Sequence, residues 1–395
     1  MCGTLNNGGN VRKSVNGLNY LGNVKYMENI PNHLSRIDGQ LGKLIILGFP
    51  FEELATNASF EEMIYLFLHN HLPNKNELDN VTKKLLSHRY LDEKILDVLK
   101  NAAAQKIELI EGVRIGVSCL TMDMESHRID KEGINGALKI IASVPIITAA
   151  YWRLLQGQAV VTPHLELSHT ANYLYMLTGE ETSPEDVKTL EIYLNTVIEH
   201  GMNASTFAAR VVMSTRSDFV SAVTAAIGAM KGVLHGGAPG PVLDMLLEMQ
   251  KSGDIEGYLR HKFENRERLM GFGHRVYRVK DPRAILLSQV SADVWKRRED
   301  KEFWGLAVDV ETTALRLLKE YKPNRRIETN VEYYTALVLH GLGLPTPLFT
   351  STFTVSRVVG WLAHCLEQLE LDRIIRPGSV YTGPTEQKWC PIEDR

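Results

Sequence analysis

The stretch YYTALVLHGLGLPTPLFTSTFTVSRVVGWLAHCLEQL, residues 333–369, decides the fold. Before Glu367 its only formally charged side chain is Arg357, and apolar residues recur through its second half at helical spacing. Such a pattern is typical of helices buried inside a protein. Because Pro345 and Pro347 interrupt the stretch, it predicts two packed helices and not one membrane-spanning helix.

Other parts of the chain carry signals for one hairpin and for many helices. Within residues 35–48 an Asp-Gly turn signal precedes a short apolar run, which is the pattern of a β-hairpin. Helix starts are marked by a capping box that joins Ser59 to Glu62 and by Ser183 followed by Pro184. Most of the remaining sequence has helical periodicity, so the predicted fold class is mainly α with a short N-terminal hairpin.

The composition is that of a folded globular protein, with 44% hydrophobic and 23% charged residues in a chain of 395. A formal net charge of -3 gives no basic excess, so neither nucleic acid nor an anionic membrane is expected as a partner. The apolar run Ile140–Trp152 is shorter than the roughly 20 residues that span a bilayer. It is therefore predicted to be a buried helix.

The cysteines and the N-terminal residues indicate the cellular compartment in which the protein is expected. Cys2, Cys119, Cys365 and Cys390 lie far apart and form no CxxC pair, which indicates neither a disulfide scaffold nor a zinc site. Residues 1–17 lack the apolar core of a signal peptide. We therefore expect a cytoplasmic protein.

The length predicts more than one domain, since a domain usually holds roughly 100–200 residues. The glycine-rich stretch Gly232–Gly240 and the polar stretch Tyr321–Arg326 are typical of boundaries. The block between them contains a mixed-charge run at residues 296–302, which is predicted to be a solvated helix face. The predicted organisation is a large helical domain of residues 1–222 and 330–395 with a small helical domain, residues 223–329, inserted in it.

Several well-known catalytic motifs are missing from the sequence, namely GxxxxGK[ST], HExxH and GxSxG. What recurs instead is histidine beside glycine, at His200, His235 and His274. A single histidine at a helix end is commonly only a cap or a partner of the helix dipole. Three of them beside glycines favour a binding site, because glycine permits a close approach of ligand to backbone.

Arg357 is the second candidate, because it lies in an otherwise uncharged helical stretch. A buried guanidinium without an anion costs several kcal/mol, so Arg357 should face a carboxylate. One interpretation is a salt bridge to Glu332 or Glu367. The other is bidentate capture of a substrate carboxylate.

Taken together, these segments resemble the citrate synthase family. The likeness extends more loosely from about residue 17 to the C-terminus. The matching segments are EHGMNASTF (199–207), KGVLHGGA (231–238), MGFGHRVY (270–277), DPR (281–283), NVEYY (330–334), SRVVGWLAH (356–364), RP (376–377) and YTGP (381–384).

The resemblance implies a two-domain helical fold, a homodimer and a Claisen-type condensation of acetyl-CoA with oxaloacetate that gives citrate and CoA. It makes Glu332 the base, His235 the hydrogen-bond donor to the enol oxygen and His274 the group that activates the ketone. The implied oxaloacetate contacts are His200, Arg283, Arg357 and Arg376, with Arg376 donated across the dimer interface.

The same resemblance implies a CoA site and no metal or redox cofactor. The residues that match this site are Leu234, Gly271, Phe272, Gly273, Arg278 and Asn330. Closure of the inserted domain over the larger one would exclude water from the thioester.

Glu332 departs from the family pattern, since the family's catalytic residue is an aspartate. The extra methylene moves the carboxylate outward, and a displacement of about 1 Å can lower a rate on the order of 100-fold. Two alternatives therefore stand beside citrate synthase. One is 2-methylcitrate synthase acting on propionyl-CoA, and the other is a non-catalytic homologue that binds carboxylates.

Overall fold

The computed structural model describes residues 30–122, 129–237, 239–274, 276–277 and 279–395. Residues Asn32–Ile374 form one compact unit, and the C-terminal segment Ile375–Arg395 belongs to a second. The described part of the chain holds sixteen α-helices and one small sheet, which confirms the predicted mainly α fold.

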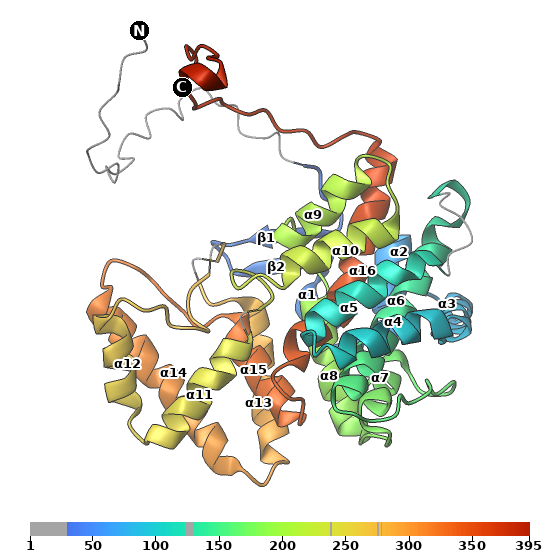
Figure 1. The fold of residues 1–395 in the computed structure, drawn as a ribbon. Helices are drawn as coiled ribbons and strands as arrows, with labels where there is room; N and C mark the ends of the chain where they lie inside the picture. Colours follow the sequence, from blue (N-terminus) through green and yellow to red (C-terminus); the bar gives the residue numbers. More distant parts are fainter. Residues whose placement is uncertain (1–29, 123–128, 238, 275, 278) are drawn as a thin grey trace. The chain divides into compact units, whose positions relative to one another are not determined.

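The elements follow in one order (Figure 1). The strands are β1 Ser35–Asp38, β2 Lys43–Ile46 and β3 Phe49–Pro50. The first helices are α1 Phe51–Asn57, α2 Phe60–His69, α3 Lys75–Ser87, α4 Glu93–Ala104, α5 Leu109–Ser118, α6 Ile129–Leu155, α7 His169–Thr178 and α8 Pro184–Val197. The others are α9 Ala204–Met213, α10 Phe219–Met230, α11 Pro239–Ser252, α12 Ile255–Glu264, α13 Pro282–Lys296, α14 Lys301–Tyr321, α15 Val331–Gly341 and α16 Leu348–Leu371.

The predicted hairpin is confirmed. Strands β1 and β2 pair antiparallel, with Ser35 opposite Ile46, and the two-residue strand β3 adds to β2. The turn lies against another segment of the chain, because a Cβ at Gly39 would come within 2.3 Å of the Val276 carbonyl oxygen. A Cβ at Gly42 would likewise lie 2.7 Å from Val279. The hairpin therefore touches the segment between His274 and α13.

The predicted helix starts are also confirmed. Ser59 and Glu62 form a complete capping box at α2, since each side chain binds the other residue's backbone N–H. At α8 the Ser183 hydroxyl accepts from the Asp186 backbone N–H, and Pro184 occupies the first turn.

Helix α6 is longer than the sequence predicts, because it runs from Ile129 to Leu155 with Pro145 inside it. Its part Gly133–Leu155 is long and apolar enough, by length and composition, to cross a membrane. However, 78% of that apolar window is buried inside the protein, where α6 packs against α5, α7 and α16. It is a core helix, as predicted.

The stretch 333–369 forms two helices, α15 and α16, separated at the two prolines as predicted. Helix α16 is buried along most of its length and contacts α6, α8, α9 and α10. Helix α15 contacts α11 and α13, which lie beside it in Figure 1. The predicted division into large and small domains stays a prediction.

The mixed-charge run at residues 296–302 is not a helix face, so that prediction is wrong. Helix α13 ends at Lys296, and α14 begins at Lys301 with Asp300 as its N-cap. The charges instead make tertiary contacts, since Arg298 donates to Asp186 at 2.8 Å. Asp300 begins a new helix as its N-cap, but in the sequence it looks like one more charged residue in the run, so the boundary between the helices is hidden.

Candidate active site

Glu332 is the second residue of α15 and is held by the residue that caps this helix. The side-chain oxygen of Asn330 accepts the Glu332 backbone N–H at 3.0 Å, while its side-chain nitrogen donates to the Gly273 carbonyl at 3.0 Å. Two backbone bonds join the same segments, from Asn330 N–H to the Gly271 oxygen at 2.9 Å and from Gly273 N–H to the Glu328 oxygen at 2.8 Å. The Gly271–Gly273 turn is therefore fixed to the start of the helix that carries Glu332.

This turn needs glycine at both ends. Gly271 has φ +83° and Gly273 has φ +86°, which are left-handed values. A Cβ at Gly271 would also lie 2.8 Å from the ring of Tyr333. Between the glycines, Phe272 is buried and pairs through a β-bridge with Thr329.

Arg283 is held by the aspartate that caps its own helix. Asp281 is the N-cap of α13, and its Oδ1 accepts the backbone N–H of Arg283 at 2.9 Å. The guanidinium then binds both carboxylate oxygens, with Nε to Oδ1 at 3.1 Å and Nη2 to Oδ2 at 2.7 Å. Burial opposes the charge of Arg283, but Asp281 outweighs burial and the pKa of Arg283 is raised.

Arg357 lies on α16 with only 1% of its surface exposed. Its Nε donates to the Val197 carbonyl at 2.6 Å, and its Cζ lies 4.7 Å from the centre of the Phe353 ring. Burial lowers its pKa to about 10, partly offset by Glu199, so it is still charged at neutral pH.

The structure does not show the salt bridge from Arg357 to Glu332 or Glu367. Glu367 instead binds Arg210 at 2.5 Å and His364 at 3.3 Å. Within the described residues Arg357 has no ion pair. A buried cation in this state favours an external anion.

His200, His274 and Tyr277 form an aromatic cluster. The ring centres of the two histidines lie 5.6 Å apart, and His200 Nε2 lies 3.2 Å from the Tyr277 hydroxyl. The Nδ1 atom of His274 accepts two backbone N–H groups, from Val276 and Tyr277, both at 3.0 Å. An accepting Nδ1 places the proton of the neutral ring on Nε2, which is therefore a donor.

His235 lies in the turn that follows α10 and contacts a serine. Its Nε2 lies 2.7 Å from the Ser205 hydroxyl, which also accepts from Trp361 Nε1 at 3.0 Å. The same hydroxyl lies 2.8 Å from the Asn203 side-chain oxygen. Because a serine has one proton, it can donate either to Asn203 or to His235.

These side chains act on one another electrostatically, so they share one region. Burial raises the pKa of Glu332 to about 7, and the charges of Arg283 and Arg357 oppose this rise. Burial lowers the pKa of His235 to about 4, assisted by Arg357, and burial with Arg283 lowers the pKa of His274 to about 4.

The pKa of His200 is also lowered, by burial and then by Arg283, His274 and Arg357. The cluster therefore combines neutral histidines, charged arginines and a carboxyl that titrates near neutral pH. Such a set is suited to acid–base chemistry on an anionic substrate.

For the other predicted site residues the structure shows exposure only, or gives no description. Leu234 is 71% exposed on the turn beside His235. Arg376 is exposed and lies in the C-terminal unit. Arg278 lies outside the described residues.

Three partners of the cluster were given no role from the sequence, although each lies in a segment quoted for the resemblance, namely Ser205, Tyr277 and Asp281. Only Asp281 had a local signal, since Asp followed by Pro is typical of a helix start. Ser205 and Tyr277 act through contacts with residues far away in the sequence, which no local pattern reveals.

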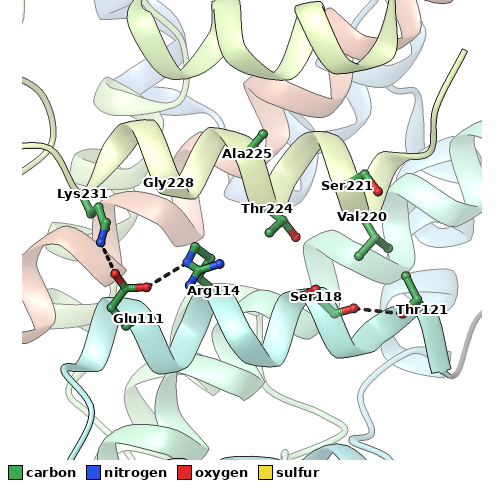
Figure 2. A pocket seen from close by; sticks show the side chains of 10 residues that line it. All are labelled: Glu111, Arg114, Ser118, Thr121, Val220, Ser221, Thr224, Ala225, Gly228 and Lys231. Carbon is green, nitrogen blue, oxygen red and sulfur yellow. Dashed lines mark hydrogen bonds and ion pairs between the residues drawn. The ribbon is translucent and has the colours of Figure 1, made fainter. Parts of the chain in front are cut away.

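A separate hollow of about 560 Å³ lies between α5 and α10 (Figure 2). Small and hydroxyl side chains such as Ser118, Thr224 and Ala225 line it. At one end Glu111 pairs with Lys231 and, at 2.8 Å, with Arg114. None of the predicted catalytic residues lines this hollow. Within the described residues no cluster of His, Cys, Asp and Glu is placed to hold a metal ion.

Comparison with known proteins identifies the family. The family model described as citrate synthase, C-terminal domain, matches residues 25–378. The chain belongs to the citrate synthase family.

Relatives in this family include one protein from an archaeon and one from a bacterium. A citrate synthase of Haloferax volcanii is 40% identical over 92% of this chain and 95% of its own length. Citrate synthase 2 of Bacillus subtilis is 39% identical over 89% of this chain and 93% of its own length.

A solved structure supports the same family. It is the ternary complex of citrate synthase from Thermoplasma acidophilum with carboxymethyl coenzyme A and oxaloacetate. It superposes with a TM-score of 0.87 at 28% identity, covering 94% of this chain and 98% of that one.

Proposed function

We propose that this protein is a citrate synthase, which condenses acetyl-CoA with oxaloacetate to give citrate and CoA. The observation that supports this best is the environment of Glu332, a carboxyl with a pKa near 7 that feels the charges of two buried arginines. A carboxylate with this pKa is a suitable base at neutral pH, because the ideal catalytic pKa lies near the operating pH.

In this proposal Glu332 removes a proton from the thioester methyl group. The resulting enol carbon attacks the keto carbon of oxaloacetate, while the Nε2–H of His274 donates to the ketone oxygen. Hydrolysis of the new thioester then releases CoA. Acid, base and hydrogen-bond donors suffice for these steps, so the proposal assigns no metal or redox cofactor.

His235 is assigned the donor to the enol oxygen, which requires a proton on its Nδ1. A neutral His235 carries that proton only when Ser205 donates to its Nε2, since an imidazole has a single N–H. Trp361 can donate to Ser205 in either case. Ser205 is thus the proposed switch between the two tautomers of His235.

Oxaloacetate is assigned to Arg283, Arg357 and His200. Arg357 supports this assignment, because a buried guanidinium without an ion pair gains most from a carboxylate ligand. Arg376 is assigned to the same substrate from the second subunit of a homodimer. Large exposed apolar side chains in its segment, among them Tyr381 at 70% and Trp389 at 80%, support a role in contact with another chain.

The CoA moiety is assigned to the Gly271–Gly273 turn, Leu234 and Asn330, together with Arg278. The exposed Leu234 beside His235 offers an apolar contact near the acyl group. Asn330 has less hydrogen-bonding capacity left for CoA than the sequence suggests, because its side chain already binds the backbone of Glu332 and of Gly273. We also place the protein in the cytoplasm, which the free thiols of Cys119, Cys365 and Cys390 support.

The test is release of the CoA thiol by the purified protein with acetyl-CoA or propionyl-CoA, each with and without oxaloacetate. We expect oxaloacetate-dependent release with a larger kcat/KM for acetyl-CoA. A preference for propionyl-CoA would instead identify a 2-methylcitrate synthase. Thermal stabilisation by oxaloacetate without any release would identify a binding protein that has lost the reaction.

A further inference from the structure

Glu311 lies on α14, inside the range that the family model matches but outside the short motifs quoted above. Both oxygens of its carboxylate are used. Oε1 accepts the Thr329 hydroxyl at 2.6 Å, and Oε2 accepts the Tyr334 hydroxyl at 2.5 Å. One carboxylate therefore binds two residues of another segment.

These two residues stand on either side of Glu332. Thr329 is buried, precedes the N-cap Asn330 and forms the bridge to Phe272. Tyr334 is buried in the first turn of α15. Glu311 thus holds the chain three residues before Glu332 and two residues after it.

The same carboxylate reaches the segment that carries Arg283. The Nζ atom of Lys280 lies 3.7 Å from Glu311 Oε1 and 5.6 Å from the centre of the Tyr334 ring. Lys280 directly precedes Asp281, the partner of Arg283. Glu311 is therefore a common partner of two segments, the one that carries Glu332 and the one that carries Arg283.

Packing alone does not fix this arrangement. A cavity of about 170 Å³ borders Glu311, Tyr334, Trp304 and Val308. Side chains beside an unfilled volume lack part of their van der Waals contacts. The hydrogen bonds to Glu311 therefore help to set where the first turn of α15 lies, together with the bonds of Asn330 to Gly271 and Gly273.

We propose that Glu311 is a positioning residue that holds the carboxylate of Glu332 in register with the Arg283 segment. This inference rests on the proposed function, in which Glu332 is the base. Glu311 touches neither substrate in that scheme and acts through Thr329 and Tyr334.

The test compares Glu311→Gln with the double variant Thr329→Val, Tyr334→Phe, which removes the two donors and keeps the carboxylate. A displaced base should lower kcat about 10-fold to 100-fold in each, with the KM for oxaloacetate changed less than about 2-fold. Adding Glu311→Gln to the double variant should lower kcat less than about 2-fold further, because only the longer contact with Lys280 at 3.7 Å then remains to be lost. The matched control is Asp309→Asn, an exposed acid on the same helix.

A second measurement does not depend on activity. Hydrogen exchange of the amides of residues 329–334 should be faster in Glu311→Gln than in the wild type, and unchanged in Asp309→Asn. Unchanged exchange, or a normal kcat in Glu311→Gln, would overturn the positioning role. An inactive wild type would overturn the proposed function instead, and the exchange measurement would still decide whether Glu311 orders this turn.

Discussion

Asp281 binds Arg283 through two parallel hydrogen bonds, Nε to Oδ1 at 3.1 Å and Nη2 to Oδ2 at 2.7 Å. Both side chains are buried, and Asp281 also caps the helix that carries Arg283. The guanidinium is thereby held in one plane and one direction. Its remaining N–H groups are thus oriented in advance of any ligand.

Arg283→Lys should therefore weaken oxaloacetate binding although the charge is kept. A lysine cannot form the planar pair with Asp281 and loses a charge-assisted hydrogen bond worth about 1.5–3 kcal/mol. We expect the KM for oxaloacetate to rise about 10-fold to 100-fold in steady-state kinetics. Arg297→Lys, at a more exposed pair with Asp186, should leave this KM unchanged. Equal effects of the two substitutions would contradict the assignment of Arg283.

Glu332→Asp should lower activity, although aspartate is the residue common in the family. The backbone around Glu332 is tied to Gly273 through Asn330, so the helix cannot advance to compensate for a shorter side chain. We expect kcat to fall on the order of 100-fold. Glu332→Gln, which cannot accept a proton, should be at least as slow. A gain of activity in Glu332→Asp would mean that the site is not built around glutamate.

The pH dependence should report the carboxyl of Glu332. A base must be ionised, and burial raises its pKa from 4.5 to about 7. Activity should therefore be about half its maximum at pH 7, approach the maximum about one unit higher and fall about tenfold per unit well below pH 7. His235 and His274, with pKa values of about 4, stay neutral over this range. Measurement of kcat/KM for acetyl-CoA between pH 5 and 9 checks this, and activity that stays constant down to pH 5 would exclude the raised pKa.

Gly39→Ala, a substitution in the turn of the hairpin, should disturb the candidate active site. The new Cβ would lie 2.3 Å from the Val276 carbonyl oxygen, so either the turn or the segment after His274 must move. We expect the free energy of unfolding to fall by about 1–3 kcal/mol and kcat to decrease with it. Thermal unfolding and turnover measure both. Gly305→Ala, an exposed helical position where a Cβ meets nothing within 4 Å, should be neutral or stabilising.

The sequence predicted the elements whose signals are local. The Asp-Gly turn at Gly39, the capping box at Ser59 and the prolines before α16 each act within a few residues, and each is confirmed. The break between α13 and α14 was missed because Asp300 looks like one more charge in a charged run.

The site was predictable only in part. Arg357 could be recognised as buried because its neighbours are uncharged, and the structure agrees. The role of Glu332 came from resemblance alone, since nothing around it in the sequence reveals a raised pKa. Its pKa depends on burial and on charges brought near it by folding, and the contacts of Ser205 and Glu311 likewise join distant parts of the chain.

The unpaired charge of Arg357 has a consequence for the choice of salt in the buffer. Among the described residues Arg357 has a carbonyl and an aromatic ring as neighbours but no ion pair. On the proposed assignment of oxaloacetate to Arg357, small inorganic anions at high concentration would compete with the substrate for this guanidinium. The choice of chloride, sulfate or phosphate in a buffer would then alter the apparent affinity for the keto acid.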